Sequence, residues 1–164
     1  MNKKMKVLPT CYQGQNFRSR LEARWAVFFD YLSIKWVYEP EGYDLGDGVW
    51  YLPDFYLSDF NHGVFAEVKP DGGDFTKAIL FGKQCDKGIW LCEGNPDLKI
   101  YKFVDEVEDD TVIPNYLKAY KENRFWWGAD ACDLDLDKFI DSKYEEGILE
   151  YLHAVSAAKN YKFH

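Results

Sequence analysis

The chain has 164 residues, of which 47% are hydrophobic and 18% aromatic, which excludes a disordered protein and allows one domain with a buried core. Its net charge is −8, and fourteen acidic against six basic residues between positions 101 and 150 account for the whole excess. The remaining residues are balanced in charge, which argues against a tight polyanion binder that ignores sequence but leaves local contacts with DNA open.

Membrane and zinc proteins are also disfavoured. No apolar run reaches the ~18 residues that a transmembrane helix needs, and no long apolar segment follows the basic N-terminus. We therefore expect no membrane association and no signal peptide. The four cysteines form no CxxC pair, and the three histidines are not spaced as zinc partners. These features predict reduced thiols in a cytoplasmic protein.

The first elements in chain order are an irregular arm over residues 1–16 and a helix over residues 17–33. One face of the predicted helix is apolar and consists of Leu21, Trp25, Phe28, Phe29 and Leu32. Residues 34–38 then alternate like a strand, and glycines and prolines mark the turns that follow.

Two further strands come next. Residues 49–57 predict a strand in which Pro53 marks an edge or a bulge, and a bulge would re-aim the next side chain, Asp54. Residues 61–63 have the composition of a hairpin turn, and residues 64–69 form the next predicted strand.

The later part of the chain returns to a helix and then to strands. Asp74 can cap a helix that runs to residue 85, although Gly82 weakens the helical pattern. Residues 88–92 are an unbroken apolar run, typical of a strand buried on both faces, and residues 99–104 predict a fifth strand.

Beyond the acidic stretch the sequence predicts helices. Residues 115–127 are expected to be partly helical, and residues 141–159 form a last long helix. The apolar side of that last helix is expected to consist of Ile148, Leu149, Leu152 and Val155.

Two short segments carry the chemistry of this chain, Pro53-Asp54 and Glu67-Val68-Lys69. Because side chains alternate along a strand, Glu67 and Lys69 point in the same direction. Two carboxylates with one ammonium are the groups that metal-dependent hydrolysis of a phosphodiester requires. Hard carboxylate oxygens bind Mg²⁺ or Mn²⁺, and the ammonium stabilises the developing negative charge.

These segments resemble the PD-(D/E)xK nuclease superfamily, which has the restriction-endonuclease-like fold. Pro53-Asp54 matches the PD element, and Glu67-Val68-Lys69 matches the (D/E)xK element. Glu22, on the preceding helix, matches the acidic residue that many members place there.

The resemblance covers roughly residues 17–95 and implies an α/β fold with an α-β-β-β-α-β core and a mixed central sheet. We expect a single domain over residues 1–164, with the nuclease-like core at 17–104 and an acidic, helical C-terminal extension at 105–164. Small phage and resolvase-like nucleases are most similar in size and spacing.

The resemblance also implies roles for individual residues. Asp54, Glu67, Glu22 and the backbone carbonyl of Val68 are expected to hold Mg²⁺ or Mn²⁺. Lys69 is expected beside the attacking water or the scissile phosphate, as a cation or, if its pKa is lowered, as a base. Asp54, Glu67, Lys69 and Glu22 would form the catalytic set of a DNA endonuclease in bacterial or phage DNA processing or recombination.

Four side chains near these elements are candidates for contacts with DNA. Arg18 and Arg20 lie in the first turns of the predicted first helix, where they could contact phosphates. Lys77 and Gln84 lie on the helix after the (D/E)xK element, which often approaches DNA in this superfamily. The same side chains could instead be ordinary solvated groups on helix surfaces.

Structural roles for the motif residues also stay open. Asp54 could simply cap a turn after a proline. Glu67 and Lys69 could be a solvent-facing pair on an amphipathic strand. Glu22 could be an ordinary surface residue paired with Arg18 one turn earlier.

Two other functions compete with the endonuclease. The chain could be a catalytically silent or regulatory DNA-binding subunit with a nuclease-like fold, or an acidic protein-binding α/β domain. Symmetric cutting of both DNA strands would require a homodimer or a larger DNA-processing complex. The sequence has no helix-turn-helix or zinc-finger pattern that would indicate sequence preference.

Overall fold

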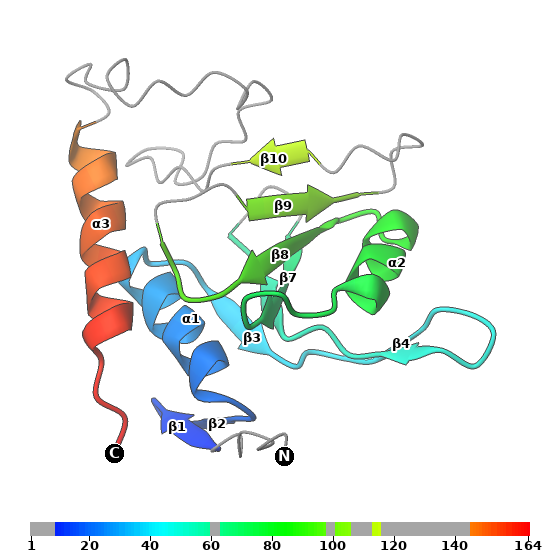
Figure 1. Cartoon of the computed structure of the whole chain (residues 1–164), viewed down its shortest axis with the longest axis horizontal. Helices are drawn as coiled ribbons and strands as arrows, with labels where there is room; N and C mark the ends of the chain where they lie inside the picture. Colours follow the sequence, from blue (N-terminus) through cyan, green and yellow to red (C-terminus); the bar gives the residue numbers. More distant parts are fainter. Residues whose placement is uncertain (1–8, 60–62, 98–100, 106–112, 116–144) are drawn as a thin grey trace.

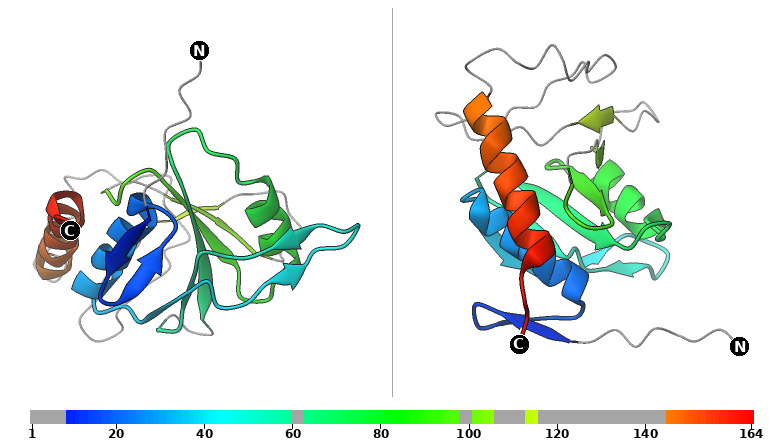
Figure 2. Two further views of the ribbon diagram at one scale, coloured as in Figure 1. Left: turned by 90° about the horizontal axis from the view of Figure 1, so that it is seen from below. Right: turned by 60° about the vertical axis from the view of Figure 1, so that its left-hand side comes forward.

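The chain folds into a central β-sheet between two layers of helices. The computed structural model describes residues 9–59, 63–97, 101–105, 113–115 and 145–164. Helices α1 (Arg20–Tyr31) and α3 (Glu145–Asn160) cover one face of the sheet, and α2 (Thr76–Gln84) covers the other (Figures 1 and 2). Helix α1 contacts both the sheet and α3, so it lies between them. The predicted α/β class with a mixed sheet is confirmed.

The central sheet contains six strands in the order β10-β9-β8-β7-β6-β3. Their bounds in chain order are β3 (Trp36–Tyr38), β6 (Phe55–Leu57), β7 (Val64–Lys69), β8 (Ile89–Glu93), β9 (Tyr101–Val104) and β10 (Ile113–Asn115). Neighbouring strands are antiparallel except for β7 and β8, which are parallel. Parallel neighbours need a crossover connection, and α2 provides it between these two strands.

Strand β8 is buried on both faces, as its unbroken apolar run predicts. Its four apolar residues, Ile89, Trp90, Leu91 and Cys92, are all buried. One core cluster on the α1 side contains Trp90 and Cys92, and a second on the α2 side contains Ile89 and Leu91. The sheet therefore separates two hydrophobic cores.

The arm expected to be irregular over residues 1–16 contains a β-hairpin instead, made of β1 (Thr10–Tyr12) and β2 (Gln15–Phe17). Gln13 and Gly14 connect the strands with φ values of 47° and 78°, the positive values that a two-residue hairpin turn requires. A non-glycine residue at positive φ is uncommon. The Gln-Gly pair is therefore a weak turn signal, and the prediction missed it.

Helix α1 begins at Arg20 rather than at residue 17, because Phe17 still belongs to β2. Ser19 caps the helix: its hydroxyl oxygen accepts the backbone N–H of Glu22 at 3.1 Å. The predicted apolar face is buried, with Trp25 and Phe28 fully inaccessible. This prediction is confirmed for the helix and for the face that it buries.

The strand predicted at residues 49–57 is split in two. Its first part, β5 (Trp50–Tyr51), pairs with β4 (Tyr43–Asp44) in a separate hairpin, and its second part is β6 in the central sheet. Pro53 lies between the two parts. Proline has no N–H for a strand ladder, so the chain leaves one sheet and enters the other at this position.

Helix α2 begins two residues after Asp74, whose carboxylate accepts the backbone N–H of Thr76 at 2.9 Å. Gly82 does not break the helix, and it lets α2 approach the sheet closely. A Cβ atom at Gly82 would lie 2.7 Å from Ile89 and 2.8 Å from Val104. The glycine that weakened the helix prediction therefore serves helix–sheet packing.

Helix α3 is confirmed, but its predicted apolar side is only partly correct. Val155 is buried as predicted, and the side chain of Ile148 lies outside the described ones. The helix buries Tyr151, Ala154, Val155 and Ala158, while Leu149 and Leu152 are 54% and 39% exposed. Small alanine side chains allow close approach to α1, and the Tyr151 hydroxyl donates to the Asp97 carbonyl at 2.7 Å. Contacts with the rest of the protein thus set the rotation of this helix.

Several other predictions concern the ends of elements. Strand β9 begins at Tyr101, and the predicted start of that strand lies outside the described residues. The segment predicted to be partly helical at 115–127 also lies outside them, except for Asn115, which ends β10. In the described part of the chain, Cys11 and Cys85 are free thiols, and the reducing compartment stays a prediction. Among the helices of the described part, none has the length and apolar character to cross a membrane.

Candidate active site

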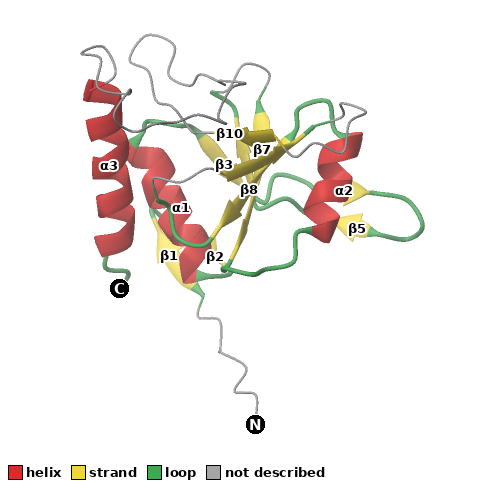
Figure 3. Cartoon of the chain, turned by 45° about the horizontal axis from the view of Figure 1, so that its top comes forward, coloured by secondary structure: helices red, strands yellow, loops and turns green. Residues whose placement is uncertain are grey.

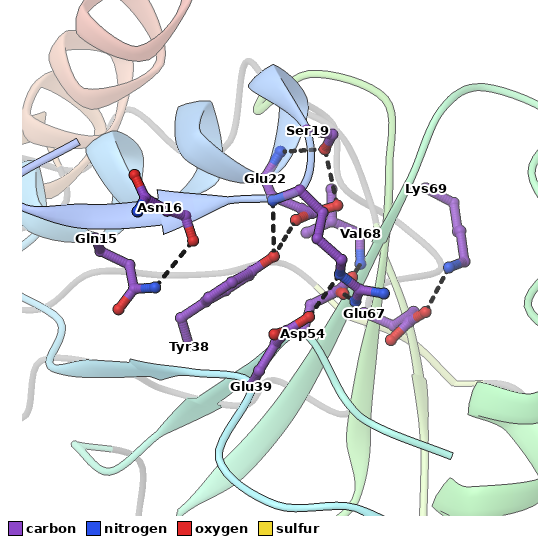
Figure 4. A network of polar contacts seen from close by, with 11 residues as sticks. Gln15, Asn16, Ser19, Glu22, Tyr38, Glu39, Asp54, Glu67, Val68 and Lys69 are labelled. Carbon is purple, nitrogen blue, oxygen red and sulfur yellow. Dashed lines mark hydrogen bonds and ion pairs between the residues drawn. The ribbon is translucent and has the colours of Figure 1, made fainter. Parts of the chain in front are cut away.

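The two motif segments meet between strands β6 and β7. Phe55 in β6 is paired with Ala66 in β7, and the strands are antiparallel. Asp54, which immediately precedes β6, therefore lies next to Glu67 in β7. Figure 4 shows these two side chains together with Lys69, Glu22 and neighbouring polar groups, close to the N-terminus of α1. The structure thus brings the PD and (D/E)xK segments side by side.

Asp54 is buried, with 1% of its surface exposed. Its Oδ2 atom accepts the backbone N–H of Val68 at 2.8 Å, and its Oδ1 atom lies 3.0 Å from the Arg18 guanidinium. Burial, together with the charges of Glu67 and Glu22, raises the pKa of Asp54 to about 8. The Val68 N–H and Lys69 oppose this rise. A buried carboxylate with an elevated pKa is typical of functional sites.

Glu67 is also buried, with 4% of its surface exposed, which excludes a solvent-facing role for this side chain. Its Oε1 atom lies 2.6 Å from the Lys69 ammonium, and its Oε2 atom accepts the Tyr51 hydroxyl at 2.6 Å. Burial favours the neutral form of Lys69, but its contact with Glu67 and the charge of Asp54 raise the pKa of Lys69 above its ordinary value. Lys69 is therefore a cation at neutral pH, which favours charge stabilisation over a role as a base.

Glu22 approaches the site from the first turn of α1 and is 8% exposed. Its Oε1 atom accepts the Ser19 hydroxyl at 2.8 Å, and its Oε2 atom accepts the Tyr38 hydroxyl. Glu22 is therefore no ordinary surface residue, and its partners are the helix cap and a tyrosine rather than Arg18. This reciprocal arrangement with Ser19 is akin to a capping box.

Arg18, predicted to contact DNA phosphates, lies against the acidic cluster. Its guanidinium contacts Asp54 and also lies beside the Glu39 carboxylate, at 2.5 Å. Its backbone N–H donates to the Tyr38 hydroxyl at 3.0 Å. Burial favours the neutral form of the guanidinium. A hydrogen bond between the Arg18 side chain and Tyr38, together with the charges of Asp54 and Glu39, nevertheless raises the pKa of Arg18, so the guanidinium stays charged.

The arrangement offers two adjacent carboxylates as metal ligands, Asp54 and Glu67. Within the described residues, no group of three or more His, Cys, Asp or Glu side chains is placed to hold a metal ion. Glu22 influences Asp54 through its charge but does not complete such a group. The hard oxygens of the pair suit Mg²⁺ or Mn²⁺, and a divalent cation would relieve the repulsion that raises the Asp54 pKa. The residues therefore fit a metal carried by two side chains, with backbone or water oxygens beside them.

In the described part of the chain, the other predicted DNA-binding residues make no hydrogen bond or ion pair with the acid pair. Arg20 is exposed at the start of α1. Lys77 and Gln84 donate to the backbone carbonyls of Trp50 and Leu45, both at 3.3 Å. Figure 3 shows β5 beside α2, so these two side chains tie the β4–β5 hairpin to the helix. Their contact with DNA stays a prediction.

Sequence reasoning missed four residues that shape the site: Ser19, Tyr38, Glu39 and Tyr51. Ser19 had a usable signal, because Ser-x-x-Glu before an apolar periodic run is a pattern of helix N-termini. The tyrosines had none, since their roles depend on hydroxyls that reach acids on other elements.

Comparisons with models of protein families, with curated proteins and with solved structures found no match to this chain. The function of the site is therefore inferred from its own side chains and their geometry.

Proposed function

We propose that the protein is a divalent-metal-dependent DNA endonuclease of the PD-(D/E)xK type. The observation that carries the proposal is the β6–β7 register, which sets the buried Asp54 beside the buried Glu67, with Lys69 on the same strand as Glu67. The element order also supports the proposal, because α1, then β3, β6 and β7 in the central sheet, then α2 and β8 follow the α-β-β-β-α-β order that the resemblance implies. The β4–β5 hairpin is inserted into this order.

The chemistry follows from the residue types. Asp54 and Glu67 would hold Mg²⁺ or Mn²⁺, and the carbonyl of Val68 remains a candidate third ligand. Such a metal supplies Lewis acidity and activates water for attack on phosphorus. Lys69, which is charged, would stabilise the negative charge that develops on the phosphoryl oxygens. Glu22, held by Ser19 and Tyr38, would orient water at the edge of the site.

The direct test is cleavage of supercoiled plasmid and branched DNA with Mg²⁺, Mn²⁺ or EDTA. Asp54→Asn keeps a carbonyl oxygen for the Val68 N–H, and Lys69→Met keeps the length of the side chain. Each substitution is expected to reduce cleavage by about 100-fold or more, since loss of one charge-stabilising group commonly costs that much. Lys35→Gln is the control, because the Lys35 side chain is exposed between α1 and β3. Cleavage that survives both Asp54→Asn and Lys69→Met would overturn the proposal.

One observation favours a second candidate, a DNA-binding module with a nuclease-like fold and no catalysis. Each carboxylate oxygen of Asp54, Glu67 and Glu22 already has a protein partner, as in a structural ion-pair network. Calorimetric titration with Mn²⁺ separates the two. The endonuclease requires binding that is lost in Asp54→Asn, whereas the silent module binds DNA but no metal at this site.

A further inference from the structure

Arg18 lies where an incoming cation would approach Asp54. We propose that Arg18 is a displaceable counter-ion, which competes with the divalent cation for Asp54 and moves to a DNA phosphate when substrate binds. Metal and DNA would then bind cooperatively through this one side chain. The inference rests on the proposed function and adds a positioning residue that links its two ligands.

The two carboxylate oxygens of Asp54 have partners that differ in exposure. Oδ2 accepts the N–H of Val68, which is fixed in the middle of the sheet on strand β7. Oδ1 contacts the Arg18 guanidinium, whose side chain is 60% exposed. Arg18 itself lies between β2 and the helix cap Ser19, outside any helix or strand. Oδ1 is therefore the oxygen that can exchange its partner without disturbing the sheet.

Glu39 keeps the guanidinium at Asp54 in the described state. The Glu39 backbone N–H donates to the Asp54 backbone carbonyl at 2.8 Å, which fixes the two residues relative to each other. The Glu39 carboxylate lies beside the Arg18 Nε atom. Glu39 has a φ of 46°, an uncommon conformation for a residue with a side chain, and such strain persists where surrounding contacts hold it. One guanidinium thus bridges two acids.

Arginine cannot leave this position by losing its proton, because its side chain stays charged throughout the physiological range. It can leave only by exchanging partners. A divalent cation at Oδ1 would repel a guanidinium at the same oxygen, since like charges a few ångströms apart are strongly unfavourable in a partly buried site. A phosphate offers the guanidinium a bidentate partner outside the acid pair.

Two consequences follow from this exchange. Without DNA, Arg18 weakens metal binding because the metal must displace it. With DNA, the phosphate holds the guanidinium, so the metal binds Asp54 without that opposition. Linkage then requires that metal also strengthens DNA binding by the same factor.

The test begins with calorimetric titration of Mn²⁺ into the full chain without DNA. Arg18→Gln is expected to lower the Mn²⁺ dissociation constant by about tenfold, within the usual range of coupling between two ligands. Arg18→Lys keeps the positive charge and should remain close to the wild type. Lys35→Gln removes an exposed positive charge between α1 and β3 and should not change Mn²⁺ binding. Thermal melting verifies that each variant is folded.

The second arm repeats the Mn²⁺ titration with a short DNA duplex in the Lys69→Met background, which keeps the DNA intact under the proposed function. DNA is expected to tighten Mn²⁺ binding about tenfold when Arg18 is present and much less in Arg18→Gln. If Arg18→Gln fails to fold, Glu39→Gln tests the same exchange, because it releases one of the two partners of the guanidinium.

The outcomes separate this inference from the proposed function. Mn²⁺ binding that depends on Asp54 but is equal in the wild type and Arg18→Gln overturns the role of Arg18 and leaves the nuclease proposal standing. Mn²⁺ binding that is absent from every variant, with and without DNA, overturns both. Tighter binding in Arg18→Gln, with loss of the DNA effect, supports the exchange.

Discussion

The two sides of the acid pair hold their carboxylates with different groups. On the α1 side, Asp54 has the backbone N–H of Val68 as its fixed donor and Arg18 as its cation. On the side of the β4–β5 hairpin, Glu67 has the buried Tyr51 hydroxyl as its fixed donor and Lys69 as its cation. The cations are 60% and 36% exposed, whereas the fixed donors lie inside the protein.

The proposed function requires that the cations can leave the acids. In a purely structural network, both partners of each buried charge are held by packing, because an unpaired buried charge is costly. Here each acid retains one permanent donor if its cation moves away. Under the proposed function, the acids can therefore exchange Arg18 or Lys69 for a divalent metal without losing all of their hydrogen bonds.

The largest expected effect comes from removing the fixed donor on the hairpin side. Tyr51→Phe deletes the hydroxyl that donates to Glu67 at 2.6 Å and leaves a buried carboxylate oxygen with one donor fewer. The free energy of unfolding should fall by about 2 kcal/mol, the usual scale for a hydrogen bond to a charged group. Urea denaturation measures the change.

Tyr38→Phe is the matched variant on the α1 side. Its hydroxyl donates to Glu22, which keeps a second donor in Ser19, and Tyr38 is only partly buried. We expect a loss of about 1 kcal/mol, smaller than for Tyr51→Phe. Equal losses, or a larger loss in Tyr38→Phe, would contradict the expectation that the more buried hydroxyl, that of Tyr51, stabilises the protein more.

The next effect in size is the pH dependence of stability, which comes from Asp54 on the α1 side. The pKa of Asp54 is raised from its ordinary value to about 8 by burial and by the charges of Glu67 and Glu22. Between about pH 4 and pH 8 the unfolded chain therefore binds fewer protons at this residue than the folded one does, so its contribution to stability decreases as pH rises. Urea denaturation of the wild type and of Asp54→Asn across this range should show a decrease that the substitution reduces.

Under the proposed function, the affinity for Mn²⁺ should change with pH in the direction opposite to that of stability. Mn²⁺ requires the ionised carboxylate, so its affinity should increase as pH rises towards 8, with release of a proton. Calorimetry in two buffers of different ionisation enthalpy measures that proton. A pH-independent affinity would mean that Asp54 is already fully ionised at neutral pH.

The smallest effect is expected on the hairpin side, away from the acids. Lys77→Ala removes an exposed contact of 3.3 Å with the Trp50 carbonyl, next to Tyr51 in β5. Surface substitutions of this kind usually change stability by less than about 0.5 kcal/mol. Proteolysis of the β4–β5 hairpin should become faster while global denaturation hardly changes. A loss above about 1 kcal/mol would show that the contact between Lys77 and the hairpin stabilises this side as much as the Tyr51 hydroxyl does.

Local chemistry made part of the fold predictable. The apolar face of α1 followed from periodicity, and the doubly buried β8 followed from its unbroken apolar run. Pro53 was expected to mark an edge or a bulge within one strand, whereas it separates two strands that belong to different sheets. The hairpin of β1 and β2 was missed because Gln13 adopts a positive φ that its residue type does not announce. On α3, Val155 is buried as predicted, but Leu149 and Leu152 were wrongly assigned to the buried side because leucine content did not set the rotation of the helix.

The sequence by itself determined the residue types of the candidate site and their order, because proline, a strand period of two and the helical Glu22 are local features. Only the tertiary structure decided which groups surround the acids. Tyr51 reaches Glu67 from a separate hairpin, and Arg18 reaches Asp54 across 36 positions of the chain. Such partners depend on how strands and helices are packed, and local propensity carries no information about that packing.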